Sequence, residues 1–107
     1  MFTEELGSRL RGIGYTVHPY DNPGDLAERL SRANYPVELV IIDLQHTSSG
    51  GLAAIAKVKE QHIPVLALGE HKKTEMLQAA RDAGADRVII NSQASDNIER
   101  YVSQLLT

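Results

Sequence analysis

Residues 37–51, which read VELVIIDLQHTSSGG, decide how the fold is interpreted. The run from Val37 to Leu44 is almost wholly apolar, carries an aspartate at position 43, and gives way to a polar loop that ends in two glycines. A continuous apolar run of this length is typical of a parallel strand that is covered on both faces. Asp43 is therefore either a local cap for the loop or the following helix, or a functional group held in place by the strand.

The flanking sequence alternates between helical and strand patterns. Helices are expected over five segments: Thr3 to Ile13, Asp25 to Asn34, Gly51 to Gln61, Lys73 to Ala83, and Ser95 or Asp96 to Leu106. Strands are expected over four segments: Tyr15 to Pro19, Val37 to Leu44, Ile63 to Leu68, and Arg87 to Ile90. The order αβαβαβαβα predicts an α/β fold, a doubly wound parallel sheet with right-handed crossovers and helices on both faces.

Length and composition limit the function. The 107 residues form one domain, residues 1–107, and the 42% hydrophobic and 23% charged content is that of a globular protein. A net charge of -3 argues against nucleic-acid binding, and the absence of cysteine excludes disulfides and thiolate chemistry. No apolar run is long enough for a membrane span and the N-terminus is no signal peptide, so we expect a cytoplasmic protein.

Three residues fall at the carboxyl ends of expected strands: Asp43, Gly69 and Asn91. In open parallel sheets, binding and catalytic sites lie at this edge. This placement favours a site at Asp43 over a purely local role.

Three segments together resemble the receiver domains of response regulators. ELVIIDL at residues 38–44, with Gly51 eight residues after Asp43, resembles their phosphoacceptor strand and loop. IPVLAL at residues 63–68 resembles their fourth strand, and AGAD at residues 83–86 resembles the approach to their fifth. The resemblance covers the chain from about Leu6 to Leu106.

This resemblance implies a flavodoxin-like, three-layer α/β/α fold for a two-component signal-transduction or phosphorelay protein. Asp43 takes the phosphoacceptor-equivalent position. The neighbouring positions of the site are His46, Thr47, Gly51, Gly69, Glu70 and Asn91.

The chain departs from the receiver pattern at several of these positions. Gly69 stands where receivers have a hydroxyl residue, Asn91 where they have a lysine, Val88 where they have an aromatic residue, and Thr47 where they have a proline. Receivers also begin with a strand that ends in an acidic pair, whereas this sequence starts where their first helix would begin. We therefore expect the first strand to be missing or replaced, by sliding of Tyr15 to Pro19, by pairing with a second chain, or by residues upstream of Met1.

These departures bear on the chemistry. Phosphoryl transfer to a carboxylate needs a metal ion and a cationic side chain to offset the negative charge of the phosphoryl group. Magnesium prefers several oxygen ligands. Asp43 beside Gly69 and Asn91 is a poor magnesium site, so no cofactor is expected, with magnesium needed only if Asp43 is phosphorylated. Zinc held by Asp43, His46 and His71 is a weaker alternative to two solvated loop histidines.

The sequence thus predicts a non-enzymatic pseudo-receiver that acts through contact with a protein partner or a second copy, most simply as a homodimer. The expected interaction face combines the last strand with its two flanking helices: Met76, Gln78, Ala79, Val88, Tyr101 and Gln104. One alternative is a functional receiver phosphorylated on Asp43. Another is a phosphate-binding fragment of a (β/α) barrel, which segments 37–51 and 83–94 also resemble.

Overall fold

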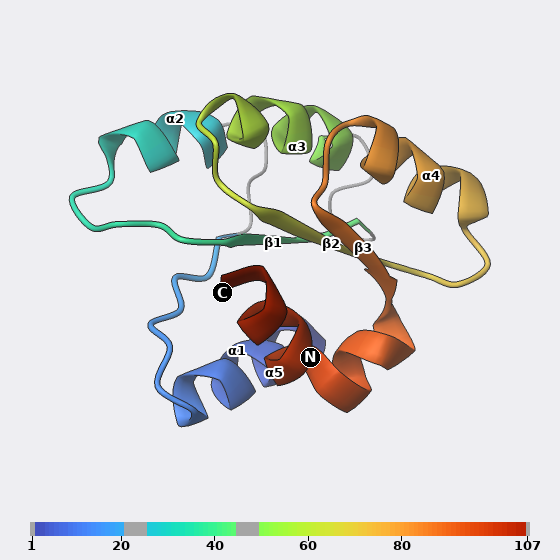
Figure 1. The fold of residues 1–107 in the computed structure, drawn as a ribbon, viewed down its shortest axis with the longest axis horizontal. Helices are drawn as coiled ribbons and strands as arrows, with labels where there is room; N and C mark the ends of the chain where they lie inside the picture. Colours follow the sequence, from blue (N-terminus) through green and yellow to red (C-terminus); the bar gives the residue numbers. More distant parts are fainter. Residues whose placement is uncertain (1, 21–25, 45–49, 107) are drawn as a thin grey trace.

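A computed structural model describes residues 2–20, 26–44 and 50–106 (Figure 1). The helices are α1 (Phe2–Gly12), α2 (Leu26–Arg32), α3 (Gly51–Glu60), α4 (Thr74–Asp82) and α5 (Asn91–Leu106). The strands are β1 (Val40–Asp43), β2 (Val65–Gly69) and β3 (Arg87–Ile90). Both sets follow the expected segments closely, apart from the first expected strand.

The strands form a parallel sheet in the order β1-β2-β3. Val40 pairs with Val65 across the first ladder, and Leu66 pairs with Arg87 across the second. All five residues of the central strand β2 are buried, which explains why its sequence is continuously apolar.

Helices cover both faces of the sheet (Figure 1). α2, α3 and α4 lie on one face, and α1 and α5 lie on the other. This three-layer arrangement confirms the expected doubly wound, flavodoxin-like class. It argues against the barrel-fragment alternative, because a (β/α) barrel carries helices on the outer face of its sheet only.

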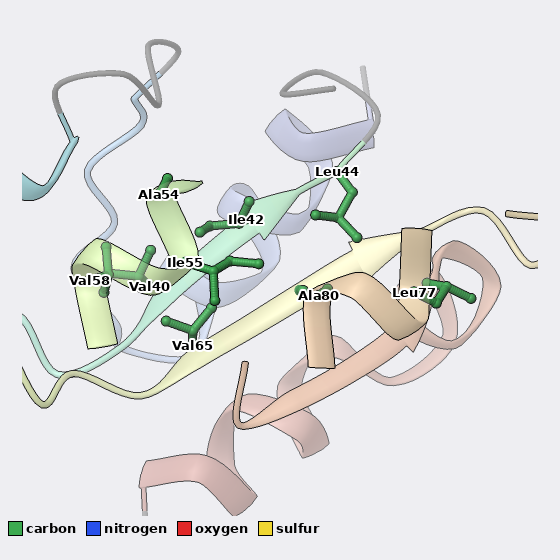
Figure 2. Packing of buried hydrophobic residues seen from close by; sticks show 10 residues of the cluster. Val40, Ile42, Leu44, Ala54, Ile55, Val58, Val65, Leu77 and Ala80 are labelled. Carbon is green, nitrogen blue, oxygen red and sulfur yellow. The ribbon is translucent and has the colours of Figure 1, made fainter. Parts of the chain in front are cut away.

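The alternation of side chains along the strands produces two separate cores. One core lies under α3 and α4 and includes Val40, Ile42, Val65, Ile55 and Leu77 (Figure 2). Ile55 is fully buried, and burial of such a side chain contributes about 1.5–3 kcal/mol.

The second core lies between the sheet and the helices α1 and α5. Its buried members are Leu6, Leu10, Leu66, Leu68, Ile89, Ala94, Ile98 and Val102. α1 is held against α5 by this apolar contact and by a bidentate ion pair, in which Arg9 Nε and Nη2 donate to the Glu99 carboxylate at 3.0 and 2.6 Å. Arg9 also donates to the Ser95 carbonyl.

Asp86 joins three elements at the amino-terminal edge of the sheet. Its carboxylate accepts from the Lys59 ammonium of α3 at 2.8 Å and from the Val65 backbone N–H at 2.7 Å. Its own N–H donates to the Val65 carbonyl at 2.9 Å. The residue before β3 therefore fixes the start of β2 relative to α3.

The expected strand from Tyr15 to Pro19 is wrong. This segment belongs to no ladder in the described residues, and its backbone is tied to α1 instead. The Tyr15 N–H donates to the Leu10 carbonyl at 3.1 Å, and Arg11 donates to the Val17 carbonyl at 3.1 Å. The described chain therefore does not compensate by sliding this segment beside β1, and the element order begins with two helices rather than αβα.

Other boundaries differ by a few residues. β1 begins at Val40 rather than Val37, and β2 begins at Val65 rather than Ile63. The last helix begins at Asn91, and Asn97 breaks it with a non-helical backbone (φ -145°, ψ 37°). The expected start at Ser95 or Asp96 lies next to this kink, where the second part of the helix begins.

Candidate functional site

The ends of the three strands bring Asp43, Gly69 and Asn91 to one edge of the sheet, as the sequence predicted. Asp43 is the last residue of β1 and pairs with Leu68, next to Gly69 at the end of β2. Gly69 pairs with Ile90, and Asn91 follows immediately as the first residue of α5.

Asp43 is buried, with 8% of its surface exposed, and no other charged residue in the described segments is buried. Its backbone belongs to the edge of the sheet as the last residue of β1. The N-cap residue of α3 is Gly50, and the loop that Asp43 was expected to cap lies outside the described residues. Gly51 is buried as the first residue of α3, whereas His46 and Thr47 lie outside the described residues.

Gly69 is surrounded by apolar side chains. A Cβ atom at this position would lie 2.7 Å from Leu77 Cδ2 and 3.4 Å from Leu44 Cδ1. The first distance is too short for two carbon atoms, so a side chain at position 69 requires Leu77 to move. Both leucines lie beside the end of β2 (Figure 2). The place of a Cβ atom at position 69 is thus bordered by a side chain of α4 and by that of the residue after β1.

A shallow depression of about 410 Å³ lies at the ends of β2 and β3. It is lined by Glu70, His71, Lys72, Ile90, Asn91 and Ser92. Glu70 and Asn91 were expected near the site, and both are half-buried here. Lys72 and Ser92 were not among the expected site residues. Each follows the end of a strand by two or three residues, so the expected topology could have placed both near this edge of the sheet. Asp43 does not line this depression.

Magnesium, the ion that the resemblance to receiver domains implies, needs several oxygen ligands. Asp43 offers one carboxylate, Gly69 offers no side chain and Asn91 offers a neutral amide. Among residues 2–20, 26–44 and 50–106 there is no group of three acidic, histidine or cysteine side chains that would hold a metal ion. The described residues therefore do not fit an octahedral magnesium site. His71 is exposed in the loop after β2, and the zinc hypothesis also needs His46, which lies outside the described residues.

The expected interaction face lies at the edge of the sheet that is formed by β3. Met76, Ala79, Val88 and Tyr101 are half-buried, and Gln78 and Gln104 are exposed. Arg87 lies over the Tyr101 ring, with its guanidinium carbon 5.0 Å from the ring centroid. Val88 packs on the α4 side and Tyr101 on the α5 side, so these residues border the edge strand from both faces.

No helix within the described ranges combines the length and the apolarity that crossing a bilayer requires.

Comparison with known proteins gives consistent matches. Residues 1–103 match the family model described as "Response regulator receiver domain". The chain is also 34% identical over 82 residues to a curated protein from Cereibacter sphaeroides, named protein-glutamate methylesterase/protein-glutamine glutaminase of group 3 operon. This match covers 74% of the chain but only 22% of the relative's length.

Two solved structures share the fold. The receiver domain of NtrX from Brucella abortus superposes with a TM-score of 0.80 at 21% identity, covering 96% of this chain and 88% of that chain. The N-terminal domain of a response regulator/sensory box/GGDEF 3-domain protein from Carboxydothermus hydrogenoformans gives a TM-score of 0.79 at 20% identity, covering 98% and 85%.

Proposed function

This chain belongs to the response regulator receiver domain family, and from that premise we propose that it is a pseudo-receiver that signals by protein contact rather than by phosphotransfer. It has a parallel sheet of three strands in the described residues and the phosphoacceptor-equivalent Asp43, but the groups around that carboxylate do not support stable phosphorylation. We place it in the cytoplasm, with a protein as its partner and without a role for nucleic acid, membrane or cofactor.

The contact between Gly69 and Leu77 carries the proposal. In receivers this position holds a hydroxyl residue, and the resemblance implies that its side chain responds to the phosphorylated aspartate. Here the position has no side chain, and Leu77 Cδ2 lies 2.7 Å from where the first carbon of one would be. A hydroxyl residue has no room unless the Leu77 side chain moves, and glycine has no hydroxyl to move.

Charge gives a second argument. A phosphoryl group on Asp43 would bring about two negative charges to an edge of the sheet that is partly buried. Receivers offset this charge with a lysine, and this chain has the neutral Asn91 at the equivalent position. Lys72 lines the neighbouring depression, and Asp43 is not among the residues that line it.

We propose that the interaction face at β3 is the surface through which the domain signals. α4 and α5 each pack against β3 from opposite faces of the sheet, and the half-buried Met76, Val88 and Tyr101 border this edge. Partly exposed apolar and aromatic side chains with an arginine nearby are the composition that protein interfaces favour. We propose that a partner protein binds here.

The chain itself is proposed to have no catalytic activity. The curated relative is named as an esterase and glutaminase, but the matched part is 22% of its length. The site described above combines one buried carboxylate with a glycine and an amide, and it holds no nucleophile activated by a base.

The proposal is tested by incubating the protein with acetyl phosphate or phosphoramidate and magnesium, followed by intact-mass measurement. We expect no phosphoryl adduct, while a phosphorylatable receiver domain treated in parallel gains one. An adduct that disappears in Asp43→Asn would instead establish the second candidate, a functional receiver phosphorylated on Asp43.

A further inference from the structure

Helix α5 consists of two segments that meet at Asn97. The backbone of Asn97 is non-helical (φ -145°, ψ 37°), and Figure 1 shows that the helix changes direction between β3 and the C-terminus. We call residues 91–96 the first segment and residues 98–106 the second segment. The junction reads Ser95-Asp96-Asn97, three residue types that are preferred at helix N-caps. The sequence therefore favours a new helix start at this point.

The two segments differ in how much apolar surface they bury. The second segment buries Ile98 and Val102 in the core that it shares with Leu6 and Leu10 of α1. Of the described residues 91–96, only Ala94 is buried, and an alanine removes less apolar surface from water than an isoleucine or a valine does. Segments with few buried apolar side chains open locally at a lower free energy than the core. The first segment should therefore open more easily than the second.

Arg9 of α1 bonds to α5 on both sides of this junction. Its guanidinium donates to the Ser95 carbonyl in the first segment and to the Glu99 carboxylate in the second. The hydrogen bond to Glu99 raises the pKa of Arg9, and the negative charge of Asp96 acts in the same direction. In an unbroken α-helix the Ser95 carbonyl accepts from the N–H four residues later. Arg9 thus gives this carbonyl a partner at the point where Asn97 interrupts the helix.

The first segment also forms part of the edge of the sheet where the strands end. Asn91 and Ser92 belong to the lining of the depression at the ends of β2 and β3. The side-chain oxygen Oε1 of Gln93 accepts from the Ile90 N–H at 3.0 Å, at the last residue of β3. A movement of the first segment therefore changes the wall of the depression and releases this N–H.

From these observations we propose that residues 91–96 form a latch that opens about Asn97 and is held closed by Arg9. When the latch opens, the second segment stays packed on α1, because Ile98 and Val102 remain in their core. The opening changes the depression at the ends of β2 and β3. A change at α1 that draws Arg9 away from Ser95 is thereby transmitted to this edge of the sheet.

The latch goes beyond the proposed pseudo-receiver function and holds whether or not Asp43 accepts a phosphoryl group. Its test therefore uses neither a phosphoryl donor nor a partner protein. The quantity to be measured is the opening of the first segment relative to that of the second.

Thiol labelling measures this opening, because the chain contains no cysteine. Ala94→Cys places a single thiol in the first segment and Val102→Cys places one in the second, both at buried positions. Under native conditions the thiol reagent DTNB should modify Ala94→Cys at least tenfold faster than Val102→Cys. Adding Arg9→Met, which removes the donors and keeps an unbranched apolar chain, should increase this ratio at least fivefold. Arg11→Met removes a guanidinium of the same helix that donates to the Val17 carbonyl, and as the matched control it should leave the ratio unchanged.

Amide hydrogen exchange provides a second measurement that needs no new side chain in the core. In the unmodified chain the Ile90 N–H should exchange through a local opening whose rate is insensitive to low urea, whereas exchange at Val102 should accelerate with urea because it needs global unfolding. In Arg9→Met, exchange at Ile90 should rise at least tenfold more than exchange at Val102.

Equal acceleration at Ile90 and Val102 in Arg9→Met would overturn the proposal, because Arg9 would then stabilise the fold as a whole. Equal labelling rates for Ala94→Cys and Val102→Cys would overturn it as well, since the two segments of α5 would then open together.

Discussion

Leu77 of α4 occupies the space that a side chain at position 69 would need, with its Cδ2 atom 2.7 Å from the place of a Cβ atom on Gly69. This contact connects a helix to the strand end beside Asp43. It accounts for the glycine in terms of packing, since Gly69 is buried and has no positive φ that would require glycine by itself.

The first prediction follows from this contact. Gly69→Thr should lower the free energy of unfolding by about 1–3 kcal/mol, the usual cost of overpacking a core. In the Leu77→Ala background the same substitution should cost less, because the space has been vacated. Urea denaturation of the four proteins in this double-mutant cycle measures the coupling.

Gly12→Ala is the matched control for this cycle. A Cβ atom at Gly12 has no neighbour within 4 Å, and the residue ends helix α1. The substitution should be neutral or stabilising by up to about 1 kcal/mol. If Gly69→Thr proved equally harmless, Leu77 would not be the constraint.

A second prediction concerns Asp86. Burial acts to raise the pKa of its carboxyl group, but the hydrogen bonds from Lys59 and the Val65 N–H outweigh burial and hold the pKa below its usual value. A lowered folded-state pKa stabilises the fold above the unfolded-state pKa, and this contribution is lost as the pH falls through the folded-state pKa. The free energy of unfolding should therefore decline below about pH 4.

Asp86→Asn tests this assignment. At neutral pH it should cost about 1 kcal/mol, a modest value because the side chain is 34% exposed and solvent screens the ion pair. The decline in acid should become shallower in the variant. Glu60→Gln, which removes an exposed carboxylate at the end of α3, serves as the control for the loss of one negative charge. An unaltered profile in Asp86→Asn would contradict the assignment.

A third prediction concerns the contact between α1 and α5. The Arg9 hydrogen bonds lower the pKa of Glu99, so the pair contributes stability above the unfolded-state pKa of the glutamate and loses it as the pH falls further. Arg9→Glu and Glu99→Arg should each lower the melting temperature at neutral pH, because each leaves two like charges together. The double exchange should recover part of the loss.

Salt provides the check on this ion pair. Both side chains are about one-third exposed, at 34% and 36%, so added salt should weaken their attraction and the repulsion in the single variants. The difference in melting temperature between the single and double variants should shrink as salt is added. A difference that does not change with salt would indicate that the loss arises from packing.

The sequence was sufficient to predict the class of fold and the residues at the strand ends. Continuous apolar runs identified β1 and β2, and the topology then placed Asp43, Gly69 and Asn91 at one edge of the sheet. The expected strand at Tyr15 to Pro19 failed for a physical reason. The alternation of apolar and polar residues predicts which side chains face inward, but a strand also needs a neighbouring strand that bonds its backbone. In this segment the backbone hydrogen bonds are made with Arg11 and Leu10 of α1 instead.

The packing around Gly69 could not be predicted from the sequence. Leu77 is one of several apolar positions on an amphipathic helix, and its spacing shows that it faces the sheet without showing which strand atom it meets. The depression lined by Lys72 and Ser92 likewise depends on how two loops approach each other. The pattern of apolar residues in the sequence does not predict which side chains of different elements contact one another.

We propose that Asp43 does not drive a phosphorylation switch. The most direct measurement is a titration with beryllium fluoride and magnesium, a mimic of the phosphoryl group, followed through the backbone amide signals of Asp43, Leu77 and Val88. We expect these amide signals not to shift. Saturable shifts at Asp43 that extend to Val88 and are absent in Asp43→Asn would contradict it.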